Sequence, residues 1–324
     1  MSLLFTLWIT LLPLITWRSY YEIPKVSWLL TGGVFALIYL IVKYRKIVFY
    51  KKDYYFLLWL FTLSLSGFLS DDIKSSILGG SYRHQGVIFF FCLWTVNKVL
   101  SFFSEKEKSL LYKGIGFSII AEAALVLMGY RLGSIGDINA VSGFLAIGIY
   151  FVYRYLPKWL LVLPVTAMIY NFSKSATMSL LPFLFKKINI LIIVIIIVLG
   201  FVIKPIDYSS PFENREVIWN HSISLIKERL LIGYGAESNE KIFKKAFYES
   251  GFPLSNLIID RAHNLLIDVT LWSGIVGLFL FAMFLYESYK TMNTELKKVF
   301  LTFLTFSMFQ PLSVVHWILF WIII

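Results

Sequence analysis

The stretch from His263 to Gly277, HNLLIDVTLWSGIVG, contains the residues with the clearest capacity for chemistry in this chain. The ionisable His263 and its neighbour Asn264 stand at the start of an apolar run that also carries Gly274 and Gly277. A neutral histidine in such a place can accept a proton from a substrate near neutral pH. Because a long polar segment precedes His263 and apolar runs surround it, the sequence predicts chemistry at a bilayer surface.

Three other polar clusters each contain a cation that suits such chemistry. Arg83 lies in SYRHQG, Lys174 in NFSKSAT and Arg215 in ENREVIW. Cations at a membrane surface favour a lipid-linked phosphate or diphosphate, and arginine offers a planar fork for paired phosphate oxygens. Since a diphosphate leaving group needs no general acid, a cationic cradle and one histidine base are enough for group transfer.

The composition indicates what kind of scaffold must position these residues. Hydrophobic residues make up 58% of the 324-residue chain and charged residues only 15%. These values predict an all-α, polytopic transmembrane helix bundle that forms one integral membrane domain over residues 1–324. The net charge of +11 is compatible with nucleic-acid binding, but many basic residues fall at predicted helix ends that face lipid headgroups. We therefore expect membrane lipids as partners and no nucleic acid.

Apolar runs near the spanning length of about 20 residues recur along the whole chain. They predict about twelve spans, or eleven if Gln310-Pro311 kinks one helix instead of separating two. The run 176–185 is too short to cross alone unless it extends or tilts. The predicted spans are 3–17, 26–42, 54–69, 87–100, 110–129, 139–153, 159–172, 176–185, 188–203, 263–286, 299–310 and 312–324.

The distribution of Lys and Arg predicts the orientation. These residues concentrate in the connections that are cytoplasmic if the N-terminus lies inside, as the positive-inside rule requires. The polar segment 204–262, the lid segment below, is then extracytoplasmic, and so is the site around His263. This topology places a multi-pass protein in the cytoplasmic (inner) membrane.

Two helices are predicted within the lid segment. Ser210-Pro211-Phe212-Glu213 has a capping-box pattern with Pro at the first helical position. An apolar stripe then predicts a first helix that ends at Gly233 and lies on the membrane, through Trp219, Ile223, Ile226 and Leu230. Arg215 precedes Trp219 by four residues and therefore shares the buried-facing stripe. A second helix is predicted from about Ser238 to Ser250.

In order and spacing, these motifs resemble those of the bacterial O-antigen ligase and O-antigen polymerase superfamily. The resemblance extends from about Ile77 to about Leu280, and the closest match is His263-Asn264 followed by Gly274-x-x-Gly277. It also includes RxxxW from Arg215 to Trp219, LLIGYG, SYRHQG and the Asn-containing helix start in SIGDINAVSGFLAIG. One position departs from the family pattern, because Lys174 stands where the family usually has arginine. Lysine keeps the charge and loses the two-pronged geometry.

The resemblance implies a metal-independent glycosyltransferase without a cofactor. Its donor is a glycan linked to undecaprenyl diphosphate, and its acceptor is the hydroxyl of a lipid or glycan. It implies catalytic roles for His263 and Arg215 and diphosphate binding by Arg83, Lys174 and Arg215. The supporting residues that it implies are Asn264, Gly274, Gly277, Tyr82 and His84.

The residues themselves agree with this chemistry, but several have structural alternatives. The carboxylates expected on the outer face are scattered and show no metal-ligand spacing, and a single Cys92 excludes a cysteine-rich metal site. Gly274 and Gly277 also fit a close helix-packing face, and Lys174 also fits a lysine that only reaches towards the headgroups. The sequence does not distinguish a ligase from a polymerase or from a transferase to protein.

A transporter or flippase of lipid-linked or anionic substrates is the alternative from another class. Glu122 and Asp268 lie inside predicted spans and would be its coupling sites. Transporters of this kind usually contain paired halves with broken helices at matching positions. The sequence has no convincing internal repeat, which favours the enzyme.

Overall fold

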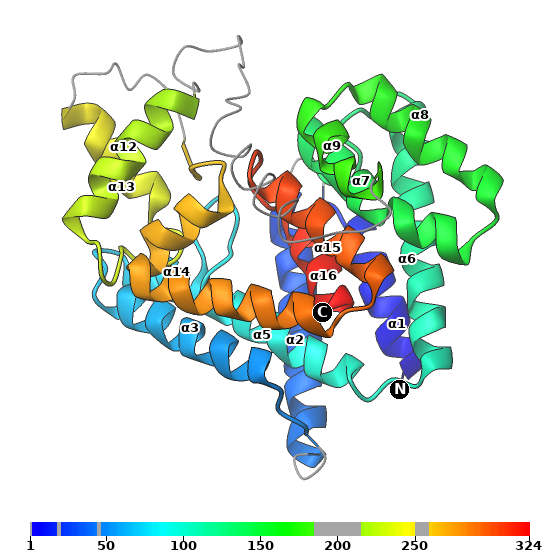
Figure 1. Cartoon of the computed structure of the whole chain (residues 1–324), viewed down its shortest axis with the longest axis horizontal. Coiled ribbons are helices and arrows are strands. Elements are labelled where there is room, and N and C mark those ends of the chain that lie inside the picture. Colours follow the sequence, from blue (N-terminus) through cyan, green and yellow to red (C-terminus); the bar gives the residue numbers. More distant parts are fainter. Residues whose placement is uncertain (1, 18–20, 44–46, 185–214, 250–258) are drawn as a thin grey trace.

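The computed structural model describes residues 2–17, 21–43, 47–184, 215–249 and 259–324. All regular secondary structure in these residues is helical (Figure 1). The fold therefore agrees with the predicted all-α membrane bundle. The helices in chain order are α1 (Ser2–Leu11), η1 (Leu12–Leu14), α2 (Glu22–Val42), α3 (Lys51–Phe68), α4 (Ile73–Leu78), α5 (Val87–Leu100), α6 (Glu105–Leu127), α7 (Ile138–Tyr155), η3 (Lys158–Leu161), α8 (Val162–Asn171), α9 (Lys174–Ser179), α10 (Leu181–Leu184), α12 (Arg215–Glu228), α13 (Asn239–Glu249), α14 (Leu265–Thr291), α15 (Thr294–Ser307) and α16 (Val314–Ile323).

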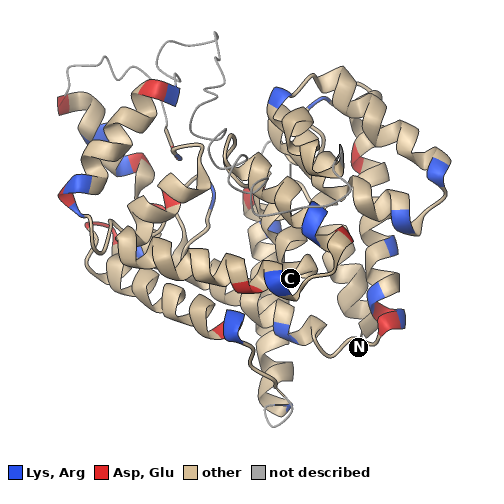
Figure 2. Cartoon of the chain, in the orientation of Figure 1, with Lys and Arg blue, Asp and Glu red and all other residues tan. Residues whose placement is uncertain are grey.

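Three helix pairs make the main packing contacts: α14 along α3, α2 along α5, and α6 along α7. The α12 and α13 helices lie together near the start of α14, and α6 to α9 form a group on the other side of α15 and α16 (Figure 1). Aromatic side chains fill the centre, where Trp59 of α3 meets Phe90 of α5 edge-on at 5.1 Å between ring centroids. Charged residues lie mainly on α12 and α13 and towards the ends of other helices (Figure 2).

By length and composition, three of the described helices can cross a membrane: α2, α6 and α14. Shorter apolar helices cover Ser2–Leu14, Val87–Leu100 and Val314–Ile323. Most predicted spans correspond to helices within a few residues, and the 87–100 prediction matches α5 at both ends. The predicted span 188–203 lies outside the described residues. The total number of spans remains a prediction.

Two predictions concern short segments that contain a proline, and in both the chain forms two helices. The predicted span 176–185 is wrong as a single helix, because the chain forms α9 and α10 with a break at Leu180. Pro182 cannot continue an α-helix from α9, since it lacks an N–H and its ring clashes with a carbonyl four residues earlier. Around Gln310-Pro311 the chain forms two helices, α15 and α16, so the alternative of one kinked helix is wrong.

Both predicted lid helices form, but the buried face of the first differs from the prediction. Arg215 and Trp219 are buried on α12, as predicted, whereas Ile223 is 49% exposed and Leu230 lies beyond the end of the helix. The remaining buried positions are Ile218, Ser222 and Leu225. The α12 helix packs on α13 and α14, and these contacts determine which face is buried. The predicted cap at 210–213 lies outside the described residues.

The α14 helix is broken at Gly274, whose φ of 66° and ψ of −171° are not helical. Backbone groups of the loop 230–235 bind across this break. The N–H of Ile275 donates to the Leu230 carbonyl at 2.8 Å, and those of Tyr234 and Gly235 donate to the Leu271 and Trp272 carbonyls. Gly274 is therefore not part of a helix-packing face, which corrects that interpretation. Gly277 does face α3, since an added Cβ would lie 3.3 Å from Thr62 Oγ1.

Substitution of Gly274 by alanine is expected to destabilise the protein by about 2–5 kcal/mol, because backbone strain and steric overlap add. A Cβ at Gly274 would lie 2.2 Å from the Leu231 carbonyl oxygen. Gly129→Ala is a matched control, because Gly129 also has a positive φ but has no atom within 4 Å of the added Cβ. Thermal unfolding of the two variants should show the larger loss for Gly274→Ala, and equal losses would contradict the docked-loop explanation.

The orientation is testable with exposed positions of the structure. In a Cys92→Ser background, a cysteine replacing exposed Lys245 on α13 should react with an impermeant thiol reagent applied to intact cells. A cysteine replacing exposed Lys106 at the start of α6 should react only after permeabilisation. Reaction at Lys106 in intact cells would reverse the predicted topology.

Candidate active site

His263 lies in the turn that leads into α14. Its φ of 59° is in the left-handed region, which directs the chain sharply into the helix. Asn264 is the N-cap, and its Oδ1 accepts hydrogen bonds from the N–H groups of Leu266 and Ile267 at 3.1 and 3.4 Å. The side chain of His263 is half-buried, and its Nδ1 is buried without a hydrogen-bond partner among the described residues. Asn264 thus supports the position of His263.

Arg215 reaches the same region from the buried face of α12, where it is only 6% exposed. Trp219, one helical turn later, donates from Nε1 to the carbonyl of Ala262 at 2.9 Å. This bond ties the face of α12 that carries Arg215 to the residue before His263. The structure thereby brings together two of the predicted residues, Arg215 and His263.

Burial, and next the positive charge of Arg215, hold the pKa of His263 well below its ordinary value. Arg83 and Arg261 act in the same direction, and the carboxylate of Asp260 opposes them. His263 is therefore neutral at neutral pH. A neutral imidazole can accept a proton, as a general base must.

Arg83 pairs with Asp260 through its Nε, and both side chains are 12% exposed. Burial alone would raise the pKa of Asp260, but the positive charges of Arg83 and Arg261 hold it below its ordinary value. The two Nη groups of Arg83 make no hydrogen bond to another described residue. Arg83 therefore keeps N–H donors for a further anion. Its partner Asp260 is one of the scattered carboxylates expected on the outer face, and the sequence does not predict the pairing.

The neighbours of Arg83 in SYRHQG play different parts. Tyr82 is 56% exposed, and its ring centroid lies 5.6 Å from the Arg83 guanidinium carbon. His84 has a φ of 56°, and its Nε2 is buried without a hydrogen-bond partner among the described residues. Gln85 donates from Nε2 to the Leu312 carbonyl at 2.8 Å, which fixes this turn against the start of α16.

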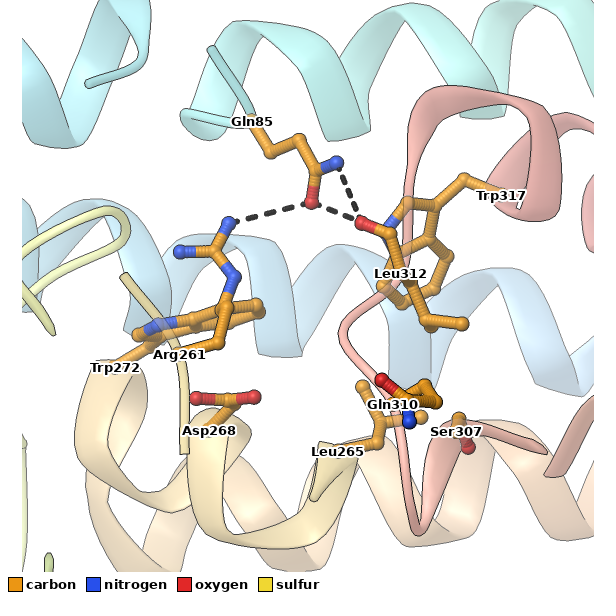
Figure 3. A pocket seen from close by; sticks show the side chains of 9 residues that line it. All are labelled: Gln85, Arg261, Leu265, Asp268, Trp272, Ser307, Gln310, Leu312 and Trp317. Carbon is orange, nitrogen blue, oxygen red and sulfur yellow. Dashed lines mark hydrogen bonds between the residues drawn. The ribbon is translucent and has the colours of Figure 1, made fainter. Parts of the chain in front are cut away.

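Arg261, which is buried two residues before His263, was not predicted as a site residue from the sequence. It forms an ion pair with Glu237, donates to Gln85 Oε1 at 3.3 Å and lies 4.8 Å from the ring centroid of Trp272. Figure 3 shows Arg261 above Trp272 and Asp268, at the wall of a small pocket that Gln85 and Trp317 also line. The adjacent charges of Asp260 and Arg261, just before His263, were the only sequence signal for it, because its partners Gln85 and Glu237 lie far away in the chain.

Lys174 does not join this cluster. It is exposed at the first residue of α9, a helix that packs on α7 and α15. No hydrogen bond or ion pair among the described residues connects it to Arg83, Arg215 or His263. The preceding Ser173 caps α9 and donates to Asn139 Oδ1 at 2.8 Å. The predicted contribution of Lys174 to the diphosphate site stays a prediction.

Glu122 and Asp268, the two carboxylates within predicted spans, both accept hydrogen bonds. Glu122 accepts from the N–H and the hydroxyl of Ser134 at the turn before α7. Asp268 accepts from Asn239 and from the backbone of Ala262. Within the described part of the chain, no group of three or more His, Cys, Asp or Glu side chains can hold a metal ion.

Comparison with protein families gives one match that covers this region. The family described as O-antigen ligase matches residues 116–282, slightly more than half of the chain. The matched stretch contains Lys174, Arg215 and His263, whereas Arg83 precedes it. Neither the curated proteins nor the solved structures contain a match to the chain.

Proposed function

Because the chain belongs to the O-antigen ligase family, it is a membrane enzyme of glycosyl transfer, of the ligase or polymerase type, and we propose its particular reaction. It transfers a glycan from an undecaprenyl-diphosphate carrier to the hydroxyl of a lipid or glycan acceptor. The transfer occurs on the extracytoplasmic face of the inner membrane and needs neither a metal ion nor another cofactor.

The observation that supports this proposal best is the meeting of one neutral histidine with arginines from separate segments. Arg215 comes from α12 and Arg83 from the turn before α5, and both act on His263 electrostatically. Cations beside a neutral base suit a reaction in which a diphosphate leaves while a hydroxyl loses its proton.

The proposed step balances without an acid catalyst. A ring nitrogen of His263 takes the proton of the acceptor hydroxyl as its oxygen forms a bond to C1 of the donor sugar. The bond between C1 and the diphosphate oxygen breaks, and both electrons leave with undecaprenyl diphosphate. Arg215 and the free Nη groups of Arg83 stabilise the negative charge on that product, each through charge-assisted hydrogen bonds.

Reconstitution of the purified protein in vesicles tests the proposal directly. The vesicles receive an undecaprenyl-diphosphate-linked glycan, with or without a candidate lipid acceptor, and the products are identified by mass spectrometry. A glycan joined to the added acceptor indicates a ligase, and longer glycans on the carrier indicate a polymerase. EDTA should change neither result.

Two outcomes would overturn the proposal. Movement of the carrier across the vesicle membrane without a new glycosidic bond would favour the transporter alternative. A strict requirement for a divalent metal would contradict the metal-independent step.

A further inference from the structure

The turn that carries His263 is held by side chains from three helices. Asp268 of α14 accepts two hydrogen bonds at Oδ1, from the N–H of Ala262 at 2.8 Å and from Nδ2 of Asn239 at 2.6 Å. Asn239 is the first residue of α13, and its Oδ1 accepts from Trp272 Nε1 at 2.9 Å. Trp219 of α12 binds the carbonyl of Ala262. Both polar groups of the residue before His263 are thereby fixed.

We propose that Asn239 and Asp268 are positioning residues, which hold the turn of His263 in register with Arg215. The inference rests on the proposed role of His263 as the base and explains how that base is placed. Asp268 fixes the turn from the side of α14, and Asn239 joins α13 to the same carboxylate oxygen. Trp219 joins α12 to the turn, one helical turn away from Arg215.

The burial of these groups favours a positioning role. Asn239 is fully buried and Asp268 is 3% exposed. A buried carboxylate that loses its hydrogen bonds destabilises the fold. Asp268 therefore favours the geometry in which both of its hydrogen bonds form. Asp268 lies below Arg261 and beside Trp272, which itself donates to Asn239 (Figure 3). A shift of α13 relative to α14 would therefore break both of the buried hydrogen bonds that join Asn239 to α14.

A loosened turn would change the surroundings of His263 in a measurable way. The charged groups that face His263 are Arg215 from α12, Arg83 from the turn before α5, and Asp260 and Arg261 from its own segment. If the turn relaxes, His263 becomes more hydrated and Arg215 moves away. The pKa of His263 then rises towards its ordinary value, and the base is protonated, and lost, at a higher pH.

Three variants separate positioning from simple stabilisation. Asn239→Asp removes the donor and places two carboxylates against each other. The double variant Asn239→Asp/Asp268→Asn restores a donor between the two positions: the amide nitrogen of residue 268 donates to residue 239, which still accepts from Trp272. The atom that donates no longer accepts from Ala262, so only this link between α13 and α14 is restored. Glu240→Ala is the matched control on α13, because it removes only the exposed hydrogen bond from Ser81 at 3.2 Å.

For Asn239→Asp we expect kcat to fall by about 10²-fold at pH 7, the effect of misplacing a reacting group by about 1 Å. The KM for the donor should change little, and the acid limb of the pH profile should move to higher pH. The double variant should regain part of the lost kcat and return the acid limb towards that of the wild type, and Glu240→Ala should match the wild type. An equal loss for Asn239→Asp at every pH, or a folded double variant without recovery, would overturn the proposal.

NMR titration of histidine-labelled protein keeps this inference separate from the proposed function. The chain has only four histidines, and His263→Ala assigns the relevant signal. We expect His263 to titrate at higher pH in Asn239→Asp than in the wild type and the double variant. If that shift occurs while His263→Ala remains active, the role of His263 as the base is wrong and the positioning holds. If His263→Ala is inactive and the titration is unchanged, the positioning role alone is wrong.

Discussion

Replacement of His263 by alanine is expected to reduce turnover by about 10²–10⁴-fold, the usual contribution of a positioned general base. The donor should still bind, because the cations that hold its diphosphate are Arg83 and Arg215. In the wild type, the pKa of His263 is lowered, so its imidazole stays neutral even at a pH below the ordinary pKa of histidine. Activity should therefore stay level as the pH falls through 6.5 and decline only at lower pH. Single-turnover assays with a lipid-linked glycan over this pH range provide the measurement.

His221→Ala is the matched control for this substitution. His221 lies on α12, the same lid helix as Arg215, but its ring packs on Phe247 of α13 at 4.4 Å between centroids, and it has no part in the proposed step. Its loss should leave activity near that of the wild type. If the activity of inserted and folded His263→Ala stays within a few-fold of the wild type, His263 is not the base and has only a structural role in the turn before α14.

Replacement of Arg215 by alanine should weaken use of the donor by roughly ten- to more than a hundredfold. One charge-assisted hydrogen bond contributes about 1.5–3 kcal/mol, which corresponds to that range of rates. Loss of Arg215 also removes the charge that, after burial, most lowers the pKa of His263. The acid limb of the pH profile should consequently move to higher pH. Measurement of kcat/KM for the donor between pH 5 and about 8 tests both effects.

Substitutions that conserve charge test the geometry of this contact. Arg215→Lys should lose more activity than Lys174→Arg, because a buried guanidinium on α12 would lose its paired hydrogen bonds. Lys174→Glu tests the exposed lysine of α9. If Lys174→Glu keeps full activity in the correctly inserted protein, the cationic cradle consists of Arg83 and Arg215.

The sequence predicted the elements that follow from local patterns. The apolar run that forms α5 and the spacing of Arg215 and Trp219 were sufficient to place a helix and its buried arginine. The break at Gly274 was not predictable, because GxxG inside an apolar run also fits continuous helix packing. Its cause lies in a loop about 40 residues earlier in the chain, which no local period reveals.

The site residues that were predicted from the sequence have a local signal, whereas the missed contacts join distant segments. His263, Arg215 and Arg83 were recognisable because cations and a histidine stand in polar clusters beside apolar runs. The ion pairs of Arg83 with Asp260 and of Arg261 with Glu237 depend on how distant segments meet. Lys174 stands in a matching motif but lies outside the cluster that the structure assembles, so its predicted role in binding the diphosphate stays a prediction.

The loop bound across the break in α14 also restricts the route by which a lipid carrier reaches His263. If the loop 230–235 moved away, the N–H of Ile275 and the carbonyls of Leu271 and Trp272 would lose their partners. Each unsatisfied backbone group costs several kcal/mol in an apolar medium, so this edge of the site cannot serve as an entrance. We therefore expect the lipid part of a substrate to enter and leave along a different side of the site.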